Sequence, residues 1–163
     1  MRKLDKYPTE GTNALWQIYN TVSKWKAMRN FVVIQLARYS PSLRFKNWLY
    51  RHMLGMKVGD NTAFALMVMV DVFFPEKIFI GNNSIIGYNT TILAHEYLVH
   101  EYRLGEVHIG SNVMIGANSI ILPGVTIGDH AVIGAGTVVH KSVEAGSFVA
   151  GNPMQVIRDA PHK

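Results

Sequence analysis

The sequence predicts a mainly β fold, a solenoid of short parallel strands, with a helical cap before it. Two observations lead to this prediction. A six-residue period headed by Ile or Val runs through residues 58–158, whereas residues 1–57 lack the period and hold all three Trp residues. A shift in composition as sharp as this marks a change of architecture, which we place at residue 57.

The overall composition favours one folded domain. The 163 residues are 48% hydrophobic and 17% charged, which is enough apolar content for a core and too little charge for a disordered chain. The absence of Cys excludes disulfides, Cys-ligated zinc and thiol nucleophiles. No stretch approaches the ~18 apolar residues of a spanning helix, and the first residues do not resemble a signal peptide. We therefore expect a cytoplasmic protein.

Residues 1–57 are expected to form a basic helical cap. Apolar residues recur at helical spacing over 15–25, and the Ser-Pro pair at 40–41 should end that first helix. A second helix is expected over 42–54. A solenoid needs such a cover over its open end.

The charge of this cap leaves two interpretations open. Residues 1–57 hold eleven Lys and Arg residues but only two carboxylates. This pattern is typical of a solvated basic face over an apolar cap, and also of a weak peripheral contact between residues 24–51 and an anionic membrane surface. No nucleic-acid-binding motif accompanies the charge and the rest of the chain is acidic, so we expect no nucleic-acid partner.

The period itself predicts the shape of the solenoid. From residue 109 the units are IGSNVM, IGANSI, ILPGVT, IGDHAV and IGAGTV. Six residues suit a short strand and a tight turn, with the first side chain pointing inward and Gly where the backbone must bend. Three units close a triangular coil, and successive coils pair in parallel about 4.8 Å apart.

Two insertions interrupt the count. Four extra residues follow Val70, and eleven follow Ile92. In a solenoid such insertions leave the stack as loops, so the longer one predicts a loop that protrudes at 96–108. The repeat should end near residue 158 and leave a C-terminal tail at 159–163.

The outward positions of the repeat predict an assembly. Two of the three faces are apolar, one with Met114 beside Val132 and one with Ile120 beside Val138. Exposed apolar stripes usually mark an interface, and three triangular prisms can close a ring through two different faces. We therefore expect a homotrimer; the alternative is that outward Val and Ile only satisfy strand propensity.

His95 is the candidate for chemistry. It stands at the fourth position of ILAHEY, where the repeat stops and the longer insertion departs, and loops on a rigid scaffold concentrate function. Together with EVHIGSNVMIGANSIILPGVTIGDHAVIGAGTVVHKSV and AGNPMQVIR, this segment resembles the hexapeptide-repeat O-acetyltransferases of galactosides, maltose and streptogramins. The resemblance implies a left-handed parallel β-helix and a trimer.

The resemblance also implies an enzyme and its substrates. The His before the protruding loop is the family's general base, so His95 would deprotonate a hydroxyl of a small acceptor as that oxygen attacks the thioester of acetyl-CoA. Imidazole suits this role because its ordinary pKa of about 6.5 leaves it largely neutral at cytoplasmic pH. The family binds CoA between subunits, and the matching positions here are Ala117, Ala135, His140, Lys141 and Arg158.

The sequence also suggests roles for Arg158, Asp71 and two glutamates. Arg158 stands where a family cation meets the nucleotide phosphates, a role that suits guanidinium. Asp71, beside the shorter insertion, is expected to bind an acceptor hydroxyl. Glu96 and Glu101 are near His95 in the chain, but the sequence does not single out the group that orients its ring.

Two other functions compete with acetyl transfer. The γ-type carbonic anhydrases share this kind of solenoid and hold zinc with three His residues. His95 and His100 are five residues apart, but no third His occupies a repeat turn near them, so we expect no metal. The second alternative is a trimeric scaffold without enzymatic activity.

Overall fold

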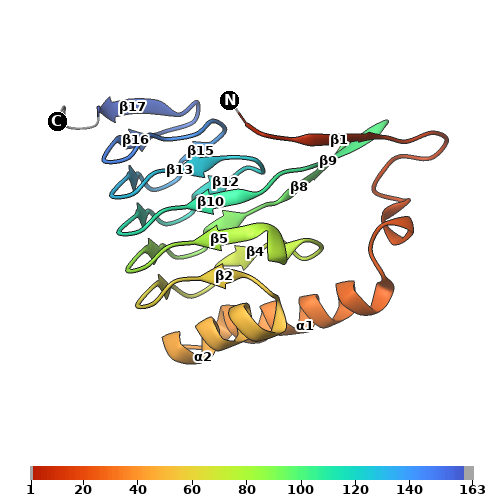
Figure 1. Ribbon diagram of the computed structural model, residues 1–163, viewed down its shortest axis with the longest axis horizontal. Helices are drawn as coiled ribbons and strands as arrows, with labels where there is room; N and C mark the ends of the chain where they lie inside the picture. The colour runs from red at the N-terminus through yellow and green to blue at the C-terminus, as the bar shows by residue number, and fades with distance from the viewer. Residues whose placement is uncertain (1, 160–163) are drawn as a thin grey trace.

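The computed structural model describes residues 2–159; the end of the predicted tail, residues 160–163, lies outside them. Three parallel sheets form the three sides of a β-helix (Figure 1). The first contains β2 (Lys57–Val58), β5 (Ile78–Ile80), β10 (Val107–Ile109) and β13 (Thr126–Ile127). The second contains β3 (Ala63–Phe64), β6 (Ile85–Ile86), β11 (Met114–Ile115), β14 (Val132–Ile133), β16 (Phe148–Ala150) and the antiparallel β17 (Gln155–Arg158). The third contains β4 (Met69–Val70), β7 (Thr91–Ile92), β12 (Ile120–Ile121) and β15 (Val138–Val139).

The strand register confirms the predicted repeat. On the third side Val70 pairs with Ile92, and Ile121 pairs with both Ile92 and Val139. The first position of one unit therefore lies on the first position of the unit one coil away. Both insertions leave the stack between strands: the shorter one ends in a 3-10 helix, η3 (Pro75–Lys77), and the longer one is a hairpin.

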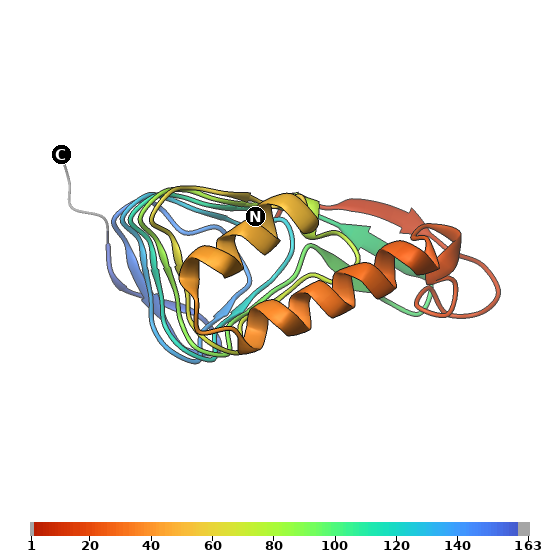
Figure 2. The same ribbon diagram turned by 90° about the horizontal axis from the view of Figure 1, so that it is seen from below.

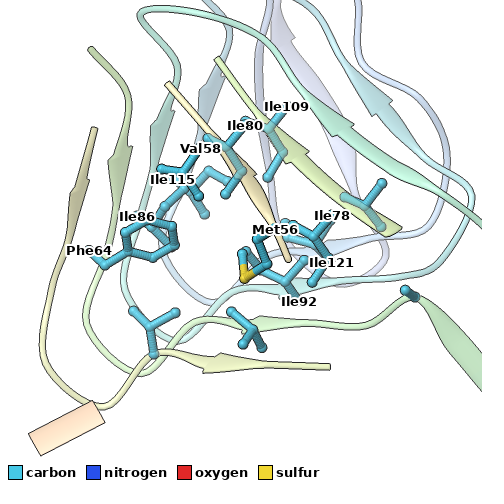
Figure 3. Close-up of a cluster of buried hydrophobic side chains, with 14 of the residues drawn as sticks. Met56, Val58, Phe64, Ile78, Ile80, Ile86, Ile92, Ile109, Ile115 and Ile121 are labelled. Carbon is cyan, nitrogen blue, oxygen red and sulfur yellow. The ribbon is translucent and has the colours of Figure 1, made fainter. Parts of the chain in front are cut away.

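The core lies inside this triangular coil. The inward Ile, Val and Phe side chains form one column of apolar contacts, as Figure 3 shows for the first three coils. Ile86, Ile92 and Ile121 are fully buried, and burying a side chain of this size contributes about 1.5–3 kcal/mol. Regular repetition of such side chains explains why a chain with two-residue strands forms a stable stack.

The glycines of the repeat have a different role from the one predicted. The left-handed backbone occurs at the fourth position of most units, for example at Asn83 (φ 53°) and Asn112 (φ 57°), and not at the second-position Gly. A Cβ on Gly81 would meet the backbone carbon of Gly110 on the next coil at 2.7 Å. Gly is therefore required because adjacent coils approach closely, and Asn bends the corner.

Helices cover the lower end of the β-helix, as predicted (Figure 2). They are α1 (Lys24–Tyr39), α2 (Leu43–Trp48) and the π-helix η2 (Leu49–Met53). The short 3-10 helix η1 (Ile18–Asn20) lies between β1 and α1 in the chain. The first long helix begins later than the apolar spacing suggests, because the side chain of Ser23 caps it by accepting a hydrogen bond from the Lys26 N–H. In the described part of the chain, no helix has the length and apolar character that crossing a membrane requires.

The cap supplies hydrogen-bond donors to the first coil, which has no coil below it. Lys46 Nζ donates to the carbonyls of Phe64 (3.0 Å) and Ala65 (2.8 Å). Asn47 Nδ2 donates to the Thr62 carbonyl and Arg51 Nε donates to the Val58 carbonyl, both at 2.7 Å. Buried carbonyls without donors are costly, so part of the basic character of residues 1–57 is structural.

Residues 2–10 differ from the helical prediction. They contain a strand, β1 (Asp5–Pro8), which pairs antiparallel with β9 (Glu101–Leu104) of the protruding insertion. The insertion itself is a hairpin of β8 (His95–Tyr97) and β9, and it projects from the stack in Figure 1. Pairing of strands this far apart in the chain leaves no local periodic signal, so the sequence pattern does not indicate it.

We expect Lys46→Met to lower the free energy of unfolding by about 1–3 kcal/mol, because two buried carbonyls lose their donor. Urea unfolding measures this change as a lower midpoint with an unchanged slope. Lys24→Met is the control, since Lys24 is exposed on the same cap. An equal, small effect of both substitutions would contradict the structural role of Lys46.

Candidate active site

The candidate site is centred on His95, which pairs with Asp71 from the coil below it. Asp71 follows β4 and His95 follows β7, and the pairing of Val70 with Ile92 brings both to the same corner of the β-helix. His95 Nδ1 lies 2.6 Å from Asp71 Oδ2. Because a carboxylate only accepts, this bond places the proton on Nδ1 and leaves Nε2 as the free acceptor.

Backbone groups hold the Asp71 carboxylate in place. Its Oδ1 accepts hydrogen bonds from the N–H groups of Phe73 (2.9 Å) and Phe74 (2.8 Å), and its Oδ2 accepts one from Ala94 (2.7 Å). The side chain is fully buried. Burial alone would raise the pKa of Asp71, but the hydrogen bond and charge of His95 and the backbone donors outweigh burial and lower that pKa below its usual value. Asp71 is therefore a fixed anion behind the imidazole.

Aromatic rings surround the imidazole. The ring centroids of Phe73 and Tyr97 each lie 5.1 Å from that of His95, and Phe74 lies 6.1 Å away. The His95 side chain retains 16% exposure. Burial raises the pKa of Tyr97, so its hydroxyl stays neutral at ordinary pH. The rings pack around the imidazole, which remains partly exposed.

The two glutamates near His95 in the chain have other partners. Glu96 pairs with Arg2 and Arg103, and Glu101 pairs with Arg103. Glu96 joins the hairpin to the N-terminal segment through Arg2, whereas Glu101 and Arg103 both lie on β9. The group that orients His95 is Asp71. The sequence led us to expect that Asp71 binds an acceptor hydroxyl. In the structure its oxygens instead accept hydrogen bonds from His95 and from backbone N–H groups. The register of the repeat was the signal in the sequence that Asp71 and His95 share a corner.

The predicted CoA positions do not meet within one chain. Ala117 and Ala135 lie on neighbouring coils at the corner between the second and third sides, where the Gly136 N–H donates to the Ala117 carbonyl at 2.8 Å. His140 and Lys141 are exposed after β15, at the corner that also holds His95. Arg158 is exposed on β17 and lines a shallow pocket with His130, Gly146 and Asp159 at the remaining corner.

Comparison with known proteins identifies the family. The family model for bacterial transferase hexapeptide (six repeats) matches residues 106–141. YvoF of Bacillus subtilis (strain 168), which has the provisional name of acetyltransferase, is 64% identical over 157 residues, covering 96% of this chain and 91% of its own length. This chain belongs to the hexapeptide-repeat acetyltransferases.

Solved structures share the fold of this hexapeptide-repeat acetyltransferase. A galactoside acetyltransferase in complex with coenzyme A superposes with a TM-score of 0.62 and 28% identity, covering 83% of this chain and 80% of that one. The acetyltransferase VCA0836 of Vibrio cholerae, complexed with acetyl-CoA, gives a TM-score of 0.72 at 21% identity over 85% and 89% of the two chains. Membership of the family establishes the left-handed sense of the β-helix.

Among residues 2–159 no group of three or more His, Asp or Glu side chains is arranged to hold a metal ion. His95 has Asp71 as its partner, and His100 lies at the tip of the hairpin.

The lowered pKa of Asp71 predicts a pH-dependent stability. A carboxyl whose pKa is lower in the folded than in the unfolded state stabilises the fold fully above its unfolded pKa, about 4, and loses this contribution as the pH falls through the folded value. The difference in the free energy of unfolding between wild type and Asp71→Asn should therefore be largest near neutral pH and shrink below about pH 4. Urea unfolding at a series of pH values measures it, and a constant difference would contradict the ionised state of Asp71.

Proposed function

We propose that this protein transfers the acetyl group of acetyl-CoA to a hydroxyl of a small, sugar-like acceptor, with His95 as the general base. As a hexapeptide-repeat acetyltransferase it uses acetyl-CoA as co-substrate. The observation that supports the hydroxyl chemistry is the pair of His95 with the buried anion Asp71. A neutral imidazole with its proton held on Nδ1 has Nε2 available to accept a proton.

The reaction follows from this arrangement. Nε2 of His95 accepts the hydroxyl proton while the acceptor oxygen bonds to the thioester carbonyl carbon. The carbon–sulfur bond then breaks, and the departing thiolate takes the proton from His95, so the products are the acetyl ester and free CoA. Asp71 stabilises the imidazolium formed in between and keeps the ring in its orientation. No acyl-enzyme is required.

The positions proposed for CoA suit its parts. Arg158 and Lys141 are exposed cations for its phosphates. Ala117 and Ala135 have no side chain beyond Cβ, so the repeat backbone can contact the pantetheine arm. Since these residues lie at different corners of one chain, a single site requires that neighbouring subunits combine them.

The outer surfaces of two sides fit such an assembly. On the second side Ala63, Ile85, Met114 and Val132 succeed one another, and Met114 is 45% exposed. On the third side Ile120, 38% exposed, adjoins Val138. The first side instead contains Lys57, Phe79, His108 and Thr126, so three of its four outward residues are polar or charged. We infer a homotrimer in which the second and third sides face neighbouring subunits.

We expect His95→Ala to lower kcat by ~10²–10⁴-fold while acetyl-CoA affinity stays nearly unchanged, because the proton acceptor is lost and the binding surface is not. Thiol release from acetyl-CoA with a panel of hydroxyl acceptors measures the rate. His108→Ala, an exposed His on the first side, is the matched control. Full turnover by His95→Ala would refute the mechanism, and loss of its fold would assign His95 a structural role.

We expect sedimentation to give three times the chain mass of 18.2 kDa at micromolar concentration. Met114→Glu combined with Ile120→Glu should produce monomers, since each substitution places a charge in an apolar interface. Thr126→Glu on the first side should leave the trimer intact. A wild-type protein that sediments as a monomer would contradict both the assembly and the shared CoA site.

A further inference from the structure

Helix α1 is apolar on two opposite faces. Its inner face packs on the β-helix through Val33, Ile34 and Ala37, which are all buried. The opposite face has side chains at helical spacing that are 50–75% exposed: Trp25, Met28, Val32, Leu36 and Tyr39. A surface helix ordinarily has a polar outer face. The second apolar face of α1 therefore indicates that something covers it.

The next helix extends the same surface. Phe45 and Trp48 of α2 are exposed, and their rings stack with centroids 6.3 Å apart. Figure 2 shows α1 and α2 side by side across the lower end of the β-helix, facing the viewer. We call the exposed apolar side chains of the two helices the cap face; it comprises Trp25, Met28, Phe31, Val32, Leu36, Tyr39, Leu43, Phe45 and Trp48.

The charge around the cap face is of one sign. Residues 11–59 contain eight Lys and Arg residues and no Asp or Glu. Lys46 and Arg51 bind carbonyls of the first coil, and Lys26 pairs with Glu76. In contrast, Lys24, Arg29 and Arg44 are exposed along the apolar stripe, where Arg29 also donates to Asn30 Oδ1 at 3.0 Å. Their exposed charge can attract an external partner.

These features match one kind of partner. Trp and Tyr concentrate where membrane headgroups meet hydrocarbon, and Lys and Arg beside them attract anionic lipids. A protein interface would be expected to avoid Lys at its centre. A second copy of this chain is a weaker candidate, because the apolar sides proposed for subunit contacts are the second and third sheets and not the end of the stack.

We propose that the cap face binds the surface of a membrane that contains anionic lipid. Trp25, Trp48 and the aliphatic side chains of α1 enter the headgroup region, and Lys24, Arg29 and Arg44 contact lipid phosphates. The helices lie parallel to the membrane plane and the β-helix projects from it. If three subunits surround an axis parallel to the stack, their cap faces turn the same way and three contacts act together.

Vesicle co-sedimentation of the full-length protein tests this proposal. The probes are vesicles of phosphatidylcholine alone and of equal parts phosphatidylcholine and phosphatidylglycerol. We expect binding to the anionic vesicles, at least tenfold weaker binding to the neutral ones, and a decrease of binding with salt. Trp fluorescence should shift to shorter wavelength with the anionic vesicles only.

Matched variants separate the apolar from the electrostatic contribution to vesicle binding. Trp25→Ser combined with Leu36→Ser should weaken anionic vesicle binding at least tenfold, and Lys24→Gln combined with Arg44→Gln should remove most of its salt dependence. Ile157→Ser is the control, because Ile157 (57% exposed) is as exposed as Leu36 (55%) and lies on β17, at the other end of the β-helix. All variants should retain wild-type turnover of a soluble acceptor, so the outcome is independent of the proposed reaction.

Two outcomes would overturn the proposal. One is equal or absent binding of wild-type protein to the two kinds of vesicle at low salt. The other is self-association beyond the trimer that Trp25→Ser with Leu36→Ser abolishes, without vesicle binding; this would assign the cap face to a second copy of the chain.

Discussion

Successive coils of this protein lie so close together that a Cβ on Gly81 would meet the backbone of Gly110 at 2.7 Å. At Gly81 the backbone therefore leaves no room for a side chain, and the parallel strands pair in register. Both insertions leave at a corner, where backbone and side chains are free to serve another purpose.

The pairing of His95 with Asp71 depends on this arrangement. Val70 and Ile92 are in register, so the residues that follow them occupy the same corner one coil apart. The shorter insertion begins there and turns the N–H groups of Phe73 and Phe74 toward Asp71 instead of along the sheet. The longer insertion leaves just after Ala94, whose N–H also binds Asp71. The places where the repeat fails thus supply the donors that hold the anion behind His95.

At the lower end of the β-helix the carbonyls of the first coil have no coil beneath them to donate hydrogen bonds. Lys46, Asn47 and Arg51 donate to these carbonyls, which explains several polar groups on an otherwise apolar cap. Lys24, Arg29 and Arg44 are exposed and do not bind these carbonyls, although Arg29 donates to Asn30 Oδ1. They lie beside apolar side chains that face outward, and this combination motivates the proposed membrane contact.

The sequence by itself determined the repeat, its inward Ile and Val positions, the sites of both insertions and the choice of His95, because each is a pattern within a short stretch of chain. Tertiary structure decided what distant segments do together. Asp71 is 24 residues from His95 in the chain and becomes its partner only through strand register. Strand β1 pairs with β9, although more than ninety residues separate them. The spacing of Trp25, Met28 and Val32 shows that they share a helix face, but only the packed structure reveals that Val33 and Ala37 cover the core and leave that face exposed. Periodicity assigns residues to faces, and three-dimensional contacts alone determine which face is covered.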